Sequence, residues 1–154
     1  MTTPFSRRAL LIAGISVTAT AACAQTARPP SALVVYKSPT CGCCGAWAEH
    51  MARAGFQARI AEVADPGSVR RDQGVPESLA SCHTALFGGY VLEGHVPAED
   101  VHKLLAERPD ALGLAVPGMP LGSPGMETPD GRREPYETVL ILKNGGTRVF
   151  ARHG

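Results

Sequence analysis

Three cysteines fall within four positions of one another, in the run Ser-Pro-Thr-Cys-Gly-Cys-Cys-Gly-Ala-Trp at residues 38–47. They are Cys41, Cys43 and Cys44. The run follows an apolar stretch at 33–36 and opens a segment with helical spacing, so we expect the thiols at the N-terminus of a helix. The partial positive charge of a helix N-terminus lowers thiol pKa values. Because thiolates attack disulfides and bind soft metal ions, the run indicates one of these two chemistries.

Cys41 and Cys44 form a Cys-x-x-Cys pair, which supports disulfide exchange with Cys41 attacking and Cys44 resolving. Cys43 weakens that interpretation, because it offers competing pairings. Neighbouring residues of a helix point about 100° apart, so a single tetrahedral zinc ion should not reach both Cys43 and Cys44 without distorting the turn. Several bridged ions would use every sulfur. Thiolate-rich sites favour Cu(I) or zinc. We favour a copper site, with a polynuclear cluster as one option, over a site that holds a single zinc ion.

Strand and helix patterns alternate along the rest of the chain. Strands are expected at 33–36, 56–63, 84–87 and 90–93, helices at 41–54, after 65 and from 97, and a final hairpin at 138–142 and 148–151. Thr40 is the expected N-cap of the first helix. This order, with the thiols between the first strand and its helix, is that of a thioredoxin-like domain, and Pro76 is a weak match to the cis-proline of that fold. We predict an α/β thioredoxin-like domain over 33–154, with a central mixed sheet, flanking helices, a C-terminal β-hairpin and a long Pro/Gly loop.

Cys82 lies in Ser-Cys-His-Thr at 81–84, directly before a predicted strand. In a thioredoxin-like arrangement this junction comes close to the start of the first helix, so Cys82 is expected to be a fourth sulfur of the site; a buried unpaired cysteine is the alternative. His83 and His95 are candidate metal ligands of lower rank, because a hydrogen-bonded structural role is favoured for each. His50 and His102 are expected on solvated helix faces.

Residues 111–135 are too rich in proline and glycine to sustain a helix or a strand. A structureless segment of this length in a compact domain is usually functional or disordered, and its apolar residues favour a loop packed over another part of the molecule. Met119 and Met126 lie in this loop. Their thioethers are donors for Cu(I), although packing onto the core is the favoured role.

The first 24 residues resemble an export signal of the twin-arginine or Sec type, with Arg7 and Arg8 before an apolar segment at 9–22. Cleavage is expected after Ala24, with a linker at 25–32; lipidation of Cys23, which would anchor the protein to a membrane, is the alternative. Without Arg7 and Arg8 the chain has 13 basic against 14 acidic residues and no basic patch, which argues against nucleic acid as a partner. A periplasmic location is expected, where clustered thiols are disulfides or metal ligands.

Four segments together resemble the CopG-type periplasmic copper-resistance family. They read Tyr-Lys-Ser-Pro-Thr-Cys-Gly-Cys-Cys at 36–44, Ser-Cys-His-Thr at 81–84, Glu-Gly-His-Val-Pro at 93–97 and Gly-Leu-Ala-Val-Pro-Gly-Met-Pro at 113–120. The resemblance spans residues 33–152 and implies a thioredoxin-like fold and redox interconversion of copper in detoxification. It also implies copper binding through four cysteines, which here are Cys41, Cys43, Cys44 and Cys82. The expected partners are metal ions and other periplasmic copper-handling proteins.

Two other functions remain open from the residues. One is a thiol–disulfide oxidoreductase that uses Cys41 and Cys44, and the other is a structural zinc module. Whether the protein is an enzyme is equally open. If it is one, the candidate activity is that of a copper-linked oxidoreductase. Metal content together with a count of free thiols would separate these alternatives.

Overall fold

The computed structural model describes residues 32–154. The predicted export signal at 1–24, Cys23 and nearly all of the linker at 25–32 lie outside these residues. The described elements follow the chain in this order: β1 (Leu33–Lys37), α1 (Gly42–Arg53), β2 (Ala58–Glu62), α2 (Pro66–Asp72), the 3-10 helix η1 (Glu77–Leu79), β3 (His83–Phe87), β4 (Tyr90–Glu93), α3 (Ala98–Glu107), β5 (Gly113–Ala115), β6 (Tyr136–Ile141) and β7 (Thr147–His153). Within residues 32–154, none of the helices has the length and apolarity needed to cross a bilayer.

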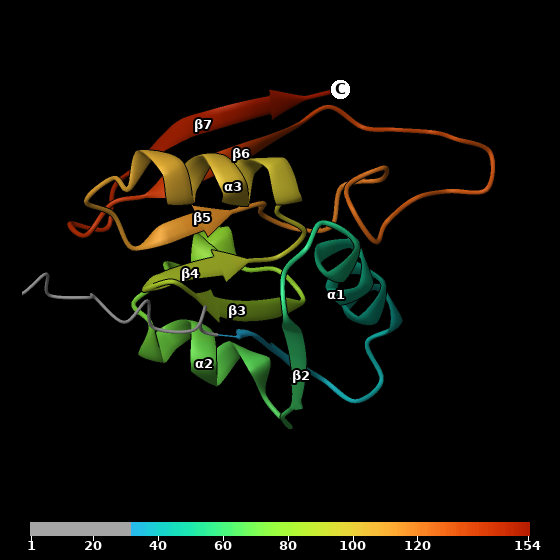
Figure 1. The fold of residues 1–154 in the computed structure, drawn as a ribbon, viewed down its shortest axis with the longest axis horizontal. Coiled ribbons are helices and arrows are strands. Elements are labelled where there is room, and N and C mark those ends of the chain that lie inside the picture. Colours follow the sequence, from blue (N-terminus) through green and yellow to red (C-terminus); the bar gives the residue numbers. More distant parts are fainter. Residues whose placement is uncertain (1–31) are drawn as a thin grey trace, which may run out of the picture.

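The strands form one seven-stranded mixed sheet in the order β2-β1-β3-β4-β5-β6-β7 (Figure 1). Strand β1 is parallel to β2 and antiparallel to β3, and β4 is parallel to β5, whereas the other neighbours are antiparallel. The predicted α/β class, central mixed sheet, flanking helices and C-terminal hairpin are confirmed. The helices and strands follow the order that led to the thioredoxin-like prediction. The assignment to the thioredoxin-like fold stays a prediction.

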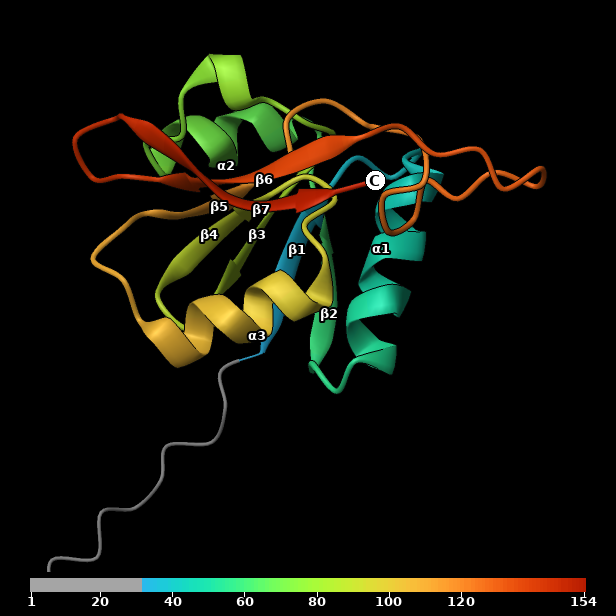
Figure 2. The ribbon, with the colours of Figure 1, turned by 90° about the horizontal axis from the view of Figure 1, so that it is seen from above.

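Apolar side chains cover both faces of the sheet, and different helices pack on each. The larger core lies under α1 and α3 and includes Trp47, Met51, Val101 and Leu104. On the opposite face, the segment after α2 contributes a smaller cluster around Val75. Figure 2 shows α2 and α3 on opposite sides of the strands. The side chains of a strand alternate between faces, so both faces of the central strands need an apolar cover.

Helix α1 is amphipathic, and its buried side chains recur every three or four residues. Cys44, Trp47 and Met51 are fully buried on that face, as predicted. The predicted cap is wrong, because Cys41, and not Thr40, is the N-cap residue, with extended backbone angles and no side-chain capping bond. The backbone N–H of Cys41 instead donates to the carbonyl of Ser38, which turns the chain from β1 into the helix.

The prediction that residues 111–135 contain no strand is wrong. Residues 113–115 form β5, which pairs with both β4 and β6 and so joins the C-terminal hairpin to the rest of the sheet. A side chain at Gly113 would overlap the carbonyl of Val91, so only glycine allows this close pairing. The cis-proline match also fails, since no peptide bond within residues 32–154 is cis and Pro76 is therefore trans.

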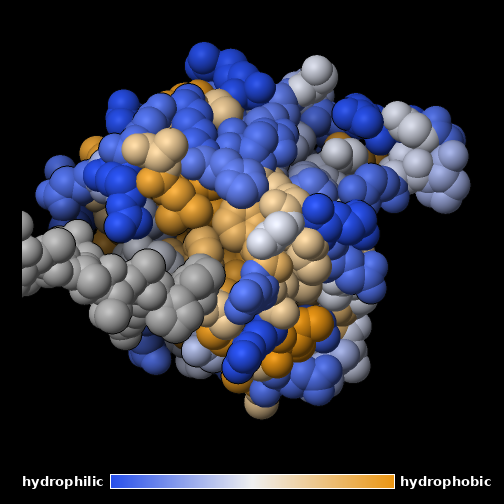
Figure 3. Space-filling view, viewed as in Figure 1, coloured by the Kyte–Doolittle hydropathy of each residue, from blue (hydrophilic) through white to orange (hydrophobic). Residues whose placement is uncertain are grey.

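Figure 3 shows an apolar area between α3 and β2 on the face seen in Figure 1. In edge strand β2, Ile60 is half exposed.

Candidate metal centre

Four cysteines meet at the N-terminal end of α1. The Sγ atoms of Cys41, Cys43, Cys44 and Cys82 all lie within 4.8 Å of one another. The fold explains this meeting, because β1 and β3 are antiparallel neighbours in which Lys37 pairs with His83. The chain that leaves β1 for α1 and the chain that enters β3 therefore lie side by side. The predicted approach of Cys82 to the helix start is confirmed.

The four thiols are not equivalent in this structure. Cys41 and Cys44 form a disulfide, whereas Cys43 and Cys82 are free. The Cys43 Sγ lies 3.5 Å from the Cys41 Sγ and 3.8 Å from the Cys82 Sγ. Cys44 is fully buried and the other three are partly exposed. All four sulfurs are therefore available to a metal ion only after the disulfide is reduced.

The Sγ atoms of Cys43 and Cys44 lie within the same 4.8 Å limit. Rotation about the side-chain bonds brings the two sulfurs together although their backbone positions differ by about 100°. Four sulfurs bound tetrahedrally to one ion at about 2.3 Å would lie roughly 3.8 Å apart. Because the Cys41 and Cys44 sulfurs are bonded to each other in this structure, the predicted difficulty of binding one zinc ion through both Cys43 and Cys44 stays a prediction.

His95 joins the sulfur cluster through Cys82. Its Nδ1–H donates to the carbonyl of Pro124 at 2.7 Å, so its neutral ring presents the Nε2 lone pair to the Cys82 Sγ at 3.0 Å. Burial lowers the pKa of His95, which favours this neutral form, although the Pro124 carbonyl opposes the effect. A histidine fixed through one ring nitrogen by a carbonyl is the usual arrangement of a metal-binding imidazole.

His83 approaches the same sulfur from β3. Its Nδ1 lies 3.4 Å from the Cys82 Sγ, and its ring packs against Trp47 at 4.5 Å between centroids. The buried Nε2 has no hydrogen-bond partner within residues 32–154. Burial, with a smaller effect from His95, lowers the pKa of His83 to about 3. Cys82, His83 and His95 thus form a second group of donors that shares a sulfur with the first, and their role as ligands stays a prediction.

The thiol of Cys82 is strongly perturbed in the metal-free protein. Burial, and then the neighbouring Cys43, raise its pKa to about 12. Cys82 is therefore a protonated thiol at neutral pH, and its S–H can donate to the Nε2 of His95. Binding of a metal ion at this sulfur must release that proton.

The loop after β5 packs over the start of α1, which confirms the prediction of a packed loop. A side-chain carbon at Gly125 would lie 2.7 Å from the carbonyl oxygen of Cys43 and 2.8 Å from the amide nitrogen of Trp47. The favoured packing role is wrong for Met119, whose surface is 52% exposed. Met126 is partly buried, and the roles of both methionines as ligands stay predictions.

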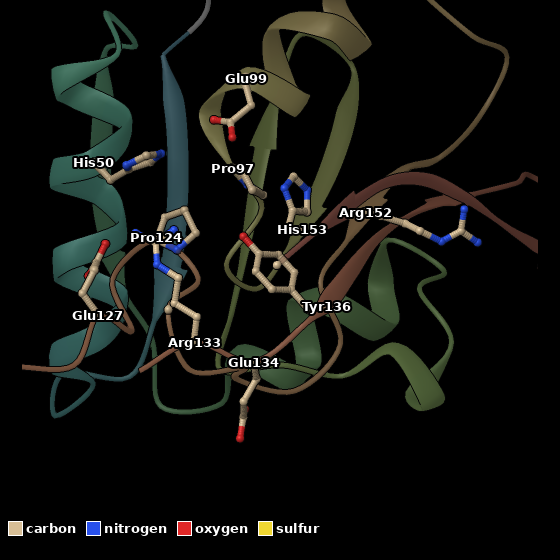
Figure 4. A pocket seen from close by; sticks show the side chains of 12 residues that line it. His50, Pro97, Glu99, Pro124, Glu127, Arg133, Glu134, Tyr136, Arg152 and His153 are labelled. Carbon is tan, nitrogen blue, oxygen red and sulfur yellow. The ribbon is translucent and has the colours of Figure 1, made fainter. Parts of the chain in front are cut away.

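A cavity of about 400 Å³ adjoins the site without including any of the cysteines. Pro124 lines this cavity (Figure 4). Its carbonyl oxygen also accepts the hydrogen bond from His95. His50 lines it from α1 and accepts a hydrogen bond from the backbone N–H of Ala98 at 3.2 Å, so the expectation of a merely solvated His50 is wrong. His102 is exposed as expected and stacks on Phe56.

Two groups near Cys82 were not predicted from the sequence. The carbonyl of Pro124 orients His95, and the buried carboxylate of Glu93 accepts a hydrogen bond from the backbone N–H of Ser81. The signal for Glu93 was present, because a charged residue ends the otherwise apolar run of β4. No sequence signal indicates which carbonyl a histidine will contact.

Comparison with known proteins places this arrangement in a family. The model of the family described as "Protein of unknown function, DUF411" matches residues 79–126. No curated protein matches the chain. Two solved structures, both named copper resistance protein CopG, are 44% identical to it. Form 1 has a TM-score of 0.75, with 80% of this chain and 98% of that one covered; form 2 has a TM-score of 0.76, with 81% and 99% covered.

The likeness to CopG covers nearly the whole of the solved chains, at an identity well above the level at which only a fold is shared. The structure of this chain also brings four cysteines together. On these grounds the chain belongs to the family of the copper resistance protein CopG.

Proposed function

We propose that this protein is an exported copper-binding protein that acts in copper resistance and holds Cu(I) through the thiolates of Cys41, Cys43, Cys44 and Cys82. The observation that carries the proposal is the convergence of four sulfurs, from two segments of the chain, within 4.8 Å. Thiolates are soft donors that suit Cu(I). The name of the similar solved structures, copper resistance protein CopG, supports copper as the metal.

The second donor group extends the proposal to Cu(II). Imidazole binds copper in both oxidation states, and His95 and His83 adjoin the Cys82 sulfur. A redox step can be written within the site: two Cu(II) ions take one electron each from the thiols of Cys41 and Cys44. The products are two Cu(I) ions, the disulfide and two protons. The disulfide in the structure supports this step, because it is the product that the step requires.

The proposed location is the periplasm, and it rests on the predicted export signal at residues 1–24. Other periplasmic copper-handling proteins would supply or accept the ion. Attachment to a membrane belongs to this proposal only if Cys23 is lipidated. Fractionation of cells, with mass measurement of the exported protein, separates cleavage after Ala24 from lipidation.

Anaerobic titration of the reduced protein with Cu(I), in competition with a coloured chelator, tests the proposal. We expect at least one copper ion per chain and a loss of affinity of at least about tenfold for Cys82→Ser, since one of four thiolates is removed. His102→Gln, which changes an exposed side chain outside the site, should bind as the native protein does. Less than one copper ion per chain, or an unchanged affinity in Cys82→Ser, would contradict the proposal.

Thiol–disulfide exchange is the second candidate, and the Cys41–Cys44 disulfide favours it. Cys41 is partly exposed and Cys44 is buried, as an attacking and a resolving thiol should be. The metal-free protein, with Cys41 and Cys44 reduced, should then reduce a disulfide substrate, and a thiol reductant in the assay should regenerate the two thiols for turnover. Cys44→Ser should trap the mixed disulfide, whereas Cys43→Ser should still turn over. Absence of turnover in the metal-free protein would remove this candidate.

A structural zinc module is the third candidate, since four cysteine sulfurs within 4.8 Å form the donor set of a structural zinc site once the disulfide is reduced. Zinc retained on purification and loss of the fold on chelation would favour it. A protein that stays folded after chelation and takes up copper would exclude it.

A further inference from the structure

A buried carboxylate holds the segment that carries Cys82. Glu93, at the end of β4, is fully buried. Its Oε1 accepts a hydrogen bond from the backbone N–H of Ser81 at 2.8 Å, and its Oε2 accepts one from the hydroxyl of Thr84 at 2.7 Å. These two donors flank Cys82 and His83 on the chain. One carboxylate therefore spans both sides of the residue pair that faces the metal centre.

The charge of Glu93 is balanced by Arg70 from α2. The Nη1 of Arg70 lies 3.6 Å from the Oε1 of Glu93, and its Nη2 donates to both carboxylate oxygens of Glu77 at 2.9 and 2.8 Å. Arg70 is buried, whereas the side chain of Glu77 is 73% exposed. A buried ion pair of this kind adds little net stability compared with apolar residues of the same size. Its presence calls for a role beyond holding the core together.

The other side of the same turn is held by the loop after β5. The hydroxyl of Ser81 donates to the carbonyl of Gly118, and the N–H of Gly118 donates to the carbonyl of Ala80 at 3.0 Å. Gly94 follows Glu93 with φ +72°, and a side chain there would meet Ser81. The turn before Cys82 is thus fixed between a buried carboxylate and a loop, with little room to shift.

We infer that Glu93, oriented by Arg70, is a positioning residue that sets the place of the Cys82 sulfur in the metal centre. This inference rests on the proposed function, because it concerns the geometry of the proposed copper site. Without the carboxylate, the Ser81 N–H loses its partner and the turn is free to move. The distances from the Cys82 Sγ to the Cys43 Sγ and to the His95 Nε2, 3.8 and 3.0 Å, then lose their support.

The test compares Glu93→Leu with Glu77→Leu in the full-length reduced protein, with Cu(I) as the probe. Leucine is used because the amide oxygen of glutamine can still accept from the Ser81 N–H. Both substitutions remove a carboxylate that pairs with Arg70, but only Glu93 also bonds the turn before Cys82. We expect Glu93→Leu to weaken Cu(I) binding by about 10–100-fold, as is typical for groups that support a metal ligand, and Glu77→Leu to leave it unchanged. Equal affinities for both variants and the native protein would overturn the inference.

A double-mutant cycle with Cys82→Ser separates positioning from a general loss of stability. If Glu93 acts through Cys82, Glu93→Leu costs nothing further once that thiol is absent. Effects that add in the double variant would overturn the inference. Alkylation of Cys82, followed by peptide mass mapping, gives a second readout without metal and should change in rate in Glu93→Leu but not in Glu77→Leu. If the native protein itself binds no copper, the proposed function fails, and this alkylation rate still decides whether Glu93 positions the thiol.

A second variant controls for misfolding, because Glu93→Leu leaves Arg70 without its buried partner. The pair Arg70→Met with Glu93→Leu replaces both charges by apolar side chains of similar size, which buried ion pairs often tolerate. It should fold and show the same loss of Cu(I) affinity. Failure of both variants to fold, judged by circular dichroism, would overturn the inference, since the pair would then support the fold as a whole.

Discussion

Replacement of Gly125 by alanine tests whether the loop after β5 seals the thiol site. Gly125 has φ +86°, and an added side-chain carbon would lie 2.7 Å from the carbonyl oxygen of Cys43 and 2.8 Å from the amide nitrogen of Trp47. Both atoms belong to the backbone of α1 and cannot rotate away. The variant therefore combines the cost of a left-handed backbone at a non-glycine residue with a steric overlap.

Gly131 in the same loop is a matched control. Its φ is +71°, and a side-chain carbon there would meet no atom within 4 Å. Gly131→Ala should lower the free energy of unfolding by about 1–2 kcal/mol, the cost of the left-handed conformation. Gly125→Ala carries this cost and a further one of about 1–3 kcal/mol from overpacking, which makes about 2–5 kcal/mol in all. Local lifting of the loop would reduce the second contribution.

Urea unfolding of the two variants measures the difference, and alkylation of Cys82 shows how it arises. Displacement of the loop at Gly125 would move the neighbouring Pro124 carbonyl, which holds His95 against the Cys82 sulfur. We therefore expect Cys82 to react faster in Gly125→Ala than in Gly131→Ala. Equal stability losses together with equal alkylation rates would refute the packing of this loop over the site.

Two further predictions concern parts of the fold outside the site. Gly113→Ala should disrupt the pairing of β5 with β4, because the new methyl group would overlap the Val91 carbonyl; we expect a loss of at least about 2 kcal/mol in urea unfolding, and wild-type stability would contradict this pairing. Burial lowers the pKa of His50 in the folded state, and Glu99 partly offsets this effect. Because the unfolded chain therefore binds a proton at His50 more readily, the stability of the fold should fall as the pH drops below about 6.5. His50→Gln should make unfolding less sensitive to acid over that range, and an unchanged pH profile would refute this role.

Local patterns along the chain predicted most of the elements. The hairpin of β3 and β4 follows from Gly88 and Gly89, which both adopt positive φ at the turn. The buried face of α1 follows from the spacing of its apolar residues. Strand β5 was missed because it is three residues long and depends on neighbours on both sides, which leaves no periodic signal of its own.

Some features of the candidate site could likewise be predicted from nearby residues, whereas others depend on residues that are distant in the sequence. The cysteines are recognisable from residue type and spacing, and the approach of Cys82 follows from the order of the elements. The orientation of His95 depends on the carbonyl of Pro124, which is 29 residues away along the chain, and the turn before Cys82 depends on Glu93, 12 residues from its donor at Ser81. Tertiary packing sets contacts of this kind, so the sequence marks Glu93 as the charged end of an apolar strand without indicating its partner.

The two leading functions compete for the same atoms. While Cys41 and Cys44 form a disulfide, neither sulfur is a thiolate, and the free donors are Cys43, Cys82 and the imidazoles that adjoin Cys82. Reduction returns the site to four thiols and a stronger preference for Cu(I). Disulfide exchange and copper binding should therefore inhibit one another in the same molecule. Metal content and free-thiol count must be measured on the same sample, because neither quantity alone identifies the state of the site.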